Sequence, residues 1–372
     1  SMLQRIQKST DEDETFSFFL PTAAGPCRVG CYHTMQKIVV DRMGMKDTVG
    51  FWSPADTDYF EGMDAGFSAL VLAGFLASDM LLAAMYDTRP TETRPGAAKE
   101  IFEFYRAEVD KLLEHTARNT KLSAGNTVGQ VVSGHMFGLI PLLKRAAKAY
   151  LSVREEKEMP TVLVVGEIFV RSEPFSNNFV IRKLDERNIR CRFAPFTELL
   201  EYTDYQDVIK ENVADYVNSF IQATMYNQAY KVMAEKLGWP ERTTVQDSLQ
   251  VAEPYIRQNL SGEAILTVGG PLHEWREGNI HGVLSVGPLE CMPNKIAEAQ
   301  FFHVAEKEGL ISLTLGLNGD PVDPEILDNF AYEVQMEFER RQQNGGWKPR
   351  PALHEECKRP SWIPYTKYNP LV

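Results

Sequence analysis

The chain has 372 residues, about two and a half times the roughly 150 residues of a typical domain, which predicts two domains or one large domain with additions. Apolar residues make up 44% and charged residues 24%, values that exclude a mainly disordered, collagenous or coiled-coil chain. Because 51 acidic residues outnumber 39 basic ones, the net charge is −12, and nucleic acid is not an expected partner.

The sequence contains no uninterrupted run of about 18 apolar residues, the length of a membrane span. The longest apolar stretch, Phe67–Ala84, is interrupted by serine, glycine and aspartate and therefore predicts a buried helix, with no membrane partner. Residues 1–14 are polar and lack the apolar centre of a signal peptide, so a cytoplasmic location is expected. Ser1 ahead of Met2 is typical of a residue left by cloning, which suggests part of a longer polypeptide.

The first part of the chain predicts a strand, a helix and a second strand. The strands are expected at Thr15–Leu20 and Thr48–Trp52, and the helix over Cys27–Met43 with Gly44 as its C-terminal cap. Three further helices are expected over residues 60–86, 97–119 and 128–150. The charged segment Arg154–Pro160 ends in proline and is the best linker candidate, which divides the chain into domains 1–155 and 156–372.

The second part of the chain alternates strands and helices. Val162–Val165 is a continuous apolar run, as in a buried parallel strand. Further strands are expected at residues 190–194, 282–286 and 311–315. Helices are expected up to 187, within 204–237, and over 247–259, 292–308 and 324–341. Glu263–Trp275 is ambiguous, because its apolar spacing fits a helix while Gly269 and Gly270 fit a strand; we favour a helix.

This alternation predicts an α/β protein of right-handed βαβ units, with two parallel sheets, helices on both faces of each and an inserted helical region. In such folds ligands bind outside the carboxyl ends of the strands.

Two segments lead from an apolar strand through Gly-Pro to a cysteine where a helix is expected to begin. They are FFLPTAAGPCRVGCYHTM, with Cys27, and VLSVGPLECMPNKI, with Cys291. Backbone N–H groups and the positive end of a helix dipole favour thiolate over thiol at such a position. Cys31 follows Cys27 by four residues, so the two share a helix face if the helix starts at Cys27.

The cysteine pattern favours an iron–sulfur cluster over zinc. No second close pair of Cys or His and no HExxH motif accompany Cys27 and Cys31, which disfavours zinc. A [4Fe–4S] cluster accepts ligands that are far apart in sequence, and three thiolates from Cys27, Cys31 and Cys291 would leave one iron open.

Three other residues are candidates for acid/base chemistry near these turns. Glu167 follows the strand at Val162–Val165, and Glu290 precedes Cys291. His33, and outside this set His281, fall near the cysteine turns in the sequence and have imidazoles suited to proton transfer. The competing interpretations are a helix cap or salt bridge for the carboxylates and a structural role for the histidines.

The remaining candidates are weaker. Cys191 and Cys357 are expected to be structural or incidental. Arg28 and Arg171 would add positive field for an anionic substrate or a reduced cluster, or are solvated surface charges. The chain has no GxGxxG, GxxxxGK[ST] or GxSxG motif, so a dinucleotide site, a Walker-type nucleotide site and a nucleophile elbow are not supported.

At these residues the chain resembles the 2-hydroxyacyl-CoA dehydratase/benzoyl-CoA reductase superfamily. The resemblance runs from Phe16 to Tyr332 and is carried by GPCRVGCYHTMQKIVVDRMG, VVGEIFVRSEPFSNNFVIRKLDERNI and GVLSVGPLECMPNKI. It is closest to the dehydratase-like region of acyl-CoA dehydratase activase-related proteins. Cys27 matches the cysteine of the family's GPCR turn and Cys291 that of its C-terminal turn, whereas Cys31 stands where glutamine is more usual.

The resemblance implies two flavodoxin-like domains and an iron–sulfur module in an ATP-driven, low-potential reductase or dehydratase system. Its implied partners are an ATP-hydrolysing activator and an acyl-CoA-like substrate; a homo-oligomer is left open. The activator's own ATPase motifs do not occur in this chain. Two alternatives are kept: a non-catalytic electron-relay or docking domain, and a small-ligand-binding α/β module with incidental cysteines.

Overall fold

The computed structural model describes residues 2–9, 13–22, 27, 29–54, 62–207, 213–260 and 262–346, with the backbone alone at 206, 207 and 213–218. The chain forms two compact units, Ser1–Asp64 and Ala65–Val372, and each is described by itself. This boundary differs from the one predicted between residues 155 and 156, because helices from both sides of residue 155 pack together in the second unit.

The first unit is a small parallel βαβ arrangement. Its elements are α1 (Met2–Gln7), β1 (Phe16–Phe19), α2 (Val29–Arg42) and β2 (Val49–Trp52). The two strands pair in parallel, with Phe16 opposite Val49. Beyond the end of α2, Gly44 has φ of +70°, and the N–H of Met45 donates to the carbonyl of Val40 at 3.0 Å. The predicted glycine cap is therefore confirmed.

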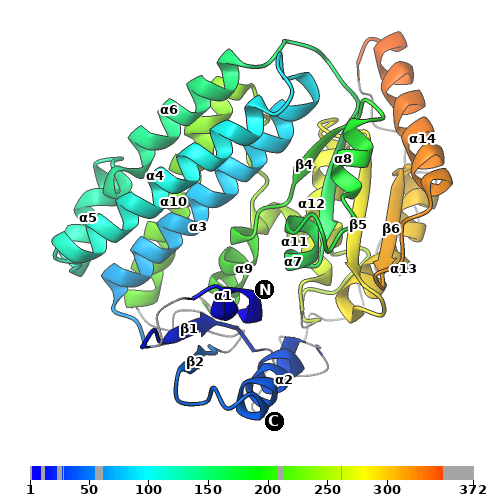
Figure 1. The fold of residues 1–372 in the computed structure, drawn as a ribbon. Coiled ribbons are helices and arrows are strands. Elements are labelled where there is room, and N and C mark those ends of the chain that lie inside the picture. Colours follow the sequence, from blue (N-terminus) through cyan, green and yellow to red (C-terminus); the bar gives the residue numbers. More distant parts are fainter. Residues whose placement is uncertain are drawn as a thin grey trace, which may run out of the picture. The chain divides into compact units, whose positions relative to one another are not determined.

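The second unit begins with a layer of long helices. They are α3 (Ala65–Thr88), α4 (Ala97–Asn119), α5 (Ala124–Val132), α6 (Leu139–Ser152) and, from much later in the chain, α10 (Val213–Leu237). In Figure 1, α3, α4, α6 and α10 run side by side. The single helix predicted over residues 128–150 is in fact α5 and α6, because the chain turns between them at Gly134 and Gly138, both with positive φ.

Contacts from the later part of the chain explain why no boundary lies near residue 155. Helix α10 packs on α3 and α6, so the helical layer is completed from beyond the predicted linker. Arg154, the first residue of that linker, pairs with Asp87 of α3 at 3.0 Å and donates to the carbonyl of Leu237 at 2.8 Å. The linker is thus anchored within one compact unit.

Helix α3 and its continuation, Ala65–Thr91, have the length and composition to cross a membrane. However, 56% of the most apolar window of this segment is buried inside the structure, against α4, α6 and α10. That burial is typical of a core helix, as the sequence predicts for Phe67–Ala84.

A four-stranded parallel sheet forms the rest of the second unit. Its strands are β3 (Thr161–Gly166), β4 (Arg190–Phe193), β5 (Gly282–Pro288) and β6 (Ser312–Leu317), in the order β4-β3-β5-β6. The associated helices are α7 (Ile168–Ser172), α8 (Val180–Asp185), α9 (Thr197–Asp207), α11 (Val245–Ala252), α12 (Ala264–Arg276), α13 (Met292–Glu308) and α14 (Pro324–Gln343). The α/β class is confirmed, and α12 confirms the helix favoured at Glu263–Trp275. The long helix expected within residues 204–237 is confirmed as α10.

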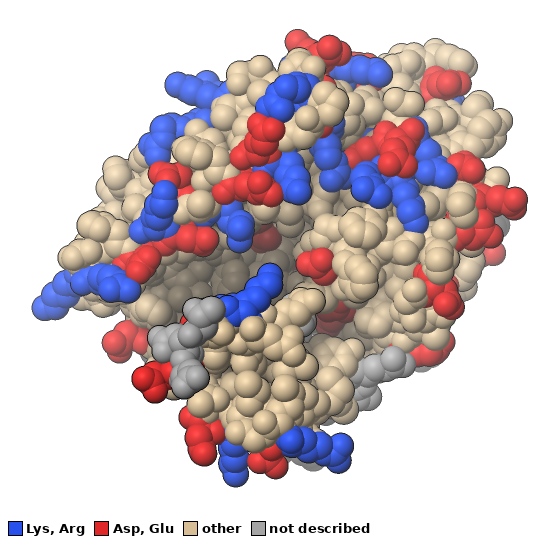
Figure 2. All heavy atoms as spheres, in the orientation of Figure 1, with Lys and Arg blue, Asp and Glu red and all other residues tan. Residues whose placement is uncertain are grey.

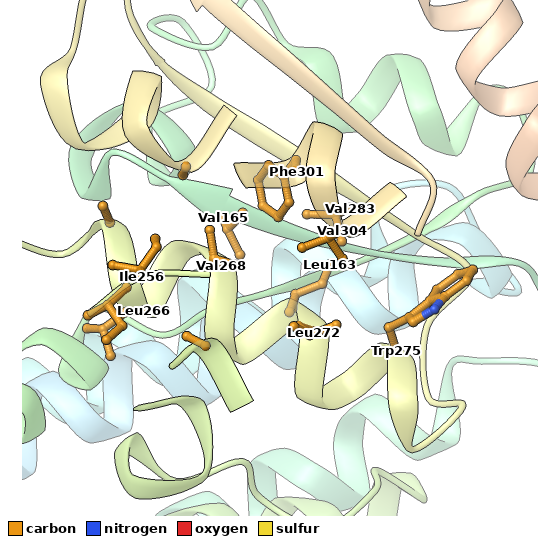
Figure 3. Packing of buried hydrophobic residues seen from close by; sticks show 14 of the residues in the cluster. Leu163, Val165, Ile256, Leu266, Val268, Leu272, Trp275, Val283, Phe301 and Val304 are labelled. Atoms are coloured by element: carbon orange, nitrogen blue, oxygen red, sulfur yellow. The ribbon is translucent and has the colours of Figure 1, made fainter. Parts of the chain in front are cut away.

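Helices α12 and α13 cover one face of this sheet. Figure 3 shows Leu163 and Val283 of the neighbouring strands β3 and β5 in a shared core with Leu272 of α12 and Phe301 of α13. These side chains are at most 6% exposed, and each full burial contributes about 1.5–3 kcal/mol. The strand order changes direction between β3 and β5, so their carboxyl ends form the switch point at which such sheets bind ligands.

Basic and acidic side chains are mixed along the exposed surface of α4. Figure 2 shows the same mixture of basic and acidic groups over much of the visible face. On α4, three exposed ion pairs connect residues three or four apart: Lys99–Glu103, Lys111–Glu108 and Arg118–Glu114. Each stabilises the helix by only about 0.2–0.5 kcal/mol.

Candidate functional site

The loop after β3 remains bonded to β5 at the switch point. Gly166 ends β3 with φ of +102°, and a Cβ there would lie 2.1 Å from the carbonyl oxygen of Val286, so only glycine fits. The N–H of Glu167 then donates to that carbonyl at 2.8 Å. The Glu167 carboxylate caps α7, accepting from the N–H groups of Phe169 at 3.2 Å and Val170 at 2.7 Å. Glu167 thus lies at the predicted edge, with its carboxylate occupied as a cap.

Cys291 lies at the N-terminus of α13, directly beyond β5. It is the N-cap residue, and its N–H donates to the carbonyl of Pro288 at 3.0 Å. The residue before it, Glu290, is exposed and has φ of +60°, a left-handed conformation that costs a non-glycine residue on the order of 1 kcal/mol. Asn294, in the first helical turn, accepts from Ser285 of β5 at 2.5 Å and fixes the start of the helix against the strand.

This placement is the one that the sequence predicts for Cys291. The side chain is partly exposed at the positive end of a 17-residue helix, an environment that favours thiolate. Glu167 and Cys291 therefore follow neighbouring strands at the same edge of one sheet.

Cys27 and Cys31 lie in the first unit, around the start of α2. Because α2 begins at Val29, Cys27 precedes the helix, and the condition under which the two cysteines would share a helix face is not met. Cys27 is instead in a turn, where its carbonyl accepts from the N–H of Gly30 at 3.2 Å. Cys31 is exposed in the first helical turn, and His33 Nδ1 lies 3.2 Å from the Gly30 carbonyl. The convergence of these two cysteines with Cys291 stays a prediction.

His281 does not accompany Cys291, contrary to its position in the sequence. It precedes β5, at the amino end of the strand, whereas Cys291 follows the carboxyl end. Seven residues of strand separate the two ends by roughly 23 Å. His281 is bonded to Thr161: its backbone N–H donates to the Thr161 carbonyl at 2.7 Å, and its ring Nδ1 accepts from the backbone N–H of Thr161 at 3.1 Å.

The other weaker candidates have structural roles or lie outside the described residues. Cys191 is fully buried in β4, and this burial raises the pKa of its thiol well above the usual range. Arg171 is also buried, and its guanidinium donates to the carbonyls of Gly166 at 3.2 Å and Pro195 at 2.9 Å. Arg28 and Cys357 lie outside the described residues.

Sequence reasoning missed a cavity of about 110 Å³ in the second unit, between α3, α9, α10 and α12 at the carboxyl end of β4. Among its lining residues are carboxylates, arginines and aromatic side chains from segments far apart in the sequence: Asp79, Asp87, Arg192, Glu198, Glu201, Tyr226, Tyr230, Trp239, Arg242 and Glu274. The prediction of ligand binding near the strand ends did not identify these residues, because none forms a local motif.

Most charged groups of this cavity are already paired. Arg242 binds both carboxylate oxygens of Glu201, at 2.7 and 3.1 Å. Arg192 pairs with Glu274 at 3.4 Å. Glu198 differs, because its carboxylate makes no hydrogen bond within the described part of the chain. Burial raises the pKa of Glu198 to about 7, against the opposing effect of Arg171.

The structure defines an α/β protein with parallel sheets of two and four strands. No family model, curated protein or solved structure matches the chain. Among the described residues, neither unit by itself holds three or more His, Cys, Asp or Glu side chains grouped as a metal site.

Proposed function

We propose that this chain is an iron–sulfur module of an ATP-driven, low-potential reductase or dehydratase system, with Cys27, Cys31 and Cys291 as the thiolate ligands of a [4Fe–4S] or related cluster. The supporting observation is the position of Cys291, on the N-terminus of α13 at the switch-point edge of the sheet. Three thiolates suit such a cluster chemically, and the two cysteine turns lie at the starts of α2 and α13.

Local geometry supports a functional role for the Cys291 turn. Glu290 is held in a left-handed conformation immediately before the cysteine, and such strain is common at functional sites. Asn294 and Ser285 anchor the first turn of α13, so the thiol is presented from a fixed helix start. A structural cysteine such as Cys191 has none of these features and is enclosed in a strand.

The finer fold assignment belongs to the same proposal. The order β4-β3-β5-β6 has the central crossover of a flavodoxin-like sheet, in which the first strand in sequence lies between the second and the third. We assign the second unit to this class, whereas the described residues of the first unit form one βαβ unit of the kind from which such a fold is built.

In this proposal the protein's own residues bind the cluster and arrange its surroundings. When bound, the cluster supplies one-electron chemistry to an acyl-CoA-like substrate, with electrons from an ATP-hydrolysing partner. The helix N-termini stabilise the thiolates. Glu290, exposed beside Cys291, and His33, near Cys31, are the candidate proton-transfer groups, whereas Glu167 positions α7 as its cap.

Cysteine variants test the assignment after anaerobic reconstitution with iron and sulfide. Cys27→Ser and Cys291→Ser are expected each to lose most of the visible absorption of the cluster, because each removes one ligand. Cys191→Ala is the matched control, since this cysteine is buried in β4 and is expected to leave the spectrum unchanged. Equal absorption in all four proteins would contradict the ligand assignment.

A further inference from the structure

The cavity beside Glu198 lies within the second unit and needs no cysteine. We propose that it binds a small organic cation, a primary ammonium group carried on a short apolar chain, with Glu198 and Tyr226 as the groups that receive the ammonium. This inference is independent of the iron–sulfur proposal.

Two polar groups of the lining lack partners. The Glu198 carboxylate makes no hydrogen bond within the described part of the chain, although it lines the cavity. Tyr226 is only 4% exposed, and its hydroxyl oxygen is buried without a hydrogen-bond partner. A buried polar group without a partner is costly, so the Tyr226 hydroxyl indicates a missing ligand or water, and the partly exposed Glu198 carboxylate is available to the same ligand.

The charge of the lining favours a cation over an anion. The two arginines that line the cavity are neutralised by Glu201 and Glu274, so no basic group is left for an anionic ligand. Arg171 lies close enough to influence Glu198, but its guanidinium is bonded to two backbone carbonyls. Asp79 adds a further carboxylate, which faces the start of α9.

An ammonium group matches the unpaired atoms. It has three donors and no acceptor, and the Glu198 carboxylate and the Tyr226 hydroxyl oxygen, which both line the cavity, are acceptors for such donors. The rings of Tyr230 and Trp239 also line the cavity and offer faces of the kind that attract cations. Leu76 and Met80 supply apolar surface for a short chain, and the volume suits a ligand of roughly five to eight non-hydrogen atoms.

The wall formed by α12 supports a binding role. Gly269, Gly270 and Pro271 lie inside this helix, where glycine and proline are unfavourable. Gly269 is explained by packing, since a Cβ there would lie 2.1 Å from the Ser248 carbonyl oxygen. Gly270 has no such constraint: a Cβ there would lie 3.5 Å from Glu198 Oε1, in ordinary contact. The bare backbone at Gly270 therefore leaves the carboxylate open to the cavity.

Calorimetric titration of the full chain with n-butylamine, n-butanol and butyrate tests this inference. The three probes have equal chain length but are cationic, neutral and anionic at neutral pH. We expect butylammonium to bind at least about tenfold more tightly than the other two, since a charged hydrogen-bonded pair is worth that much. No saturable binding of butylammonium, or equal binding of all three probes, would overturn the proposal.

Two variants locate the site. Glu198→Gln is expected to weaken butylammonium binding about tenfold or more, because it removes the charge and keeps the shape. Gly270→Ala keeps the charge but covers the carboxylate with a methyl group, and is expected to weaken binding without loss of the fold. The control, Glu186→Gln, changes an exposed carboxylate near the end of α8 and should bind normally. Wild-type affinity in Glu198→Gln or in Gly270→Ala would refute the assignment.

Discussion

Asp79 and Thr197, 118 residues apart, are joined by two hydrogen bonds. The Asp79 carboxylate accepts from the backbone N–H of Thr197 at 2.8 Å and from its hydroxyl at 2.7 Å. It also accepts from the N–H of Phe196 at 3.1 Å. A side chain of α3 therefore caps α9 and connects the helical layer with the end of β4.

Replacing Asp79 by Asn is expected to destabilise the protein by about 1–3 kcal/mol. The amide keeps one acceptor oxygen, but its NH₂ group would face donors that the second carboxylate oxygen now satisfies. Urea unfolding would measure the change. Asp110→Asn, at an exposed position on α4, is the control and should shift the unfolding free energy by no more than about 0.5 kcal/mol.

The neighbouring glycines of α12 are expected to respond in opposite directions to the same substitution. Gly270→Ala should stabilise the protein by about 0.5–1 kcal/mol, because alanine is the better helix former and the added Cβ meets only ordinary contacts. Gly269→Ala should destabilise it by about 2 kcal/mol or more, since its Cβ would overlap the Ser248 backbone. Thermal and urea unfolding would measure the stability of both variants. A change in the same direction for Gly269→Ala and Gly270→Ala would contradict this packing.

Protonation of His281 is expected to weaken the fold in acid. Burial, assisted by the nearby Arg341 charge, lowers the pKa of His281 to about 4 from 6.5. Between those values the unfolded chain binds the proton and the folded chain does not, so this contribution to stability is lost as the pH falls from 6.5 to 4. The loss is on the order of 2–3 kcal/mol.

His281→Asn is the comparison for this pH effect, because its amide keeps an acceptor for the Thr161 N–H but does not titrate. Unfolding free energies measured over the same pH range should fall less steeply in the variant. Parallel curves for the two proteins would show that His281 does not carry the effect.

The ionisation of Glu198 is expected to change the stability with pH in the direction opposite to that of His281. Burial raises the pKa of Glu198 to about 7 from 4.5, so between these values the folded chain holds a proton that the unfolded chain releases. Its effect is to reduce stability as the pH rises through this window. Glu198→Gln should therefore stabilise the ligand-free protein at about pH 8, by on the order of 2 kcal/mol. A destabilised variant at that pH would contradict the raised pKa of the Glu198 carboxylate.

Local sequence patterns predict much of the fold. The helices expected over residues 97–119 and 292–308 begin and end where α4 and α13 do. Apolar periodicity, Gly44 and the Gly-Pro turn before Cys291 each act within a few residues, so the local sequence is sufficient. The start of α2 was missed, because the spacing of Cys27 and Cys31 is equally compatible with a turn that precedes the helix.

Contacts between residues that are far apart in the sequence were harder to predict from it. His281 was grouped with Cys291 because they are ten residues apart, but β5 separates them. The cavity combines Asp79, Glu198 and Tyr226 from three helices, and no local pattern indicates such a meeting. The one signal in the sequence was the pair of glycines followed by proline inside a predicted helix, since a sequence that breaks a local rule often does so at a site.

The most direct test of the proposed function is the iron and acid-labile sulfide content of the full chain after anaerobic reconstitution and desalting. About four irons and four sulfides per chain are expected for one [4Fe–4S] cluster. An iron content that stays below about one per chain would contradict the proposal.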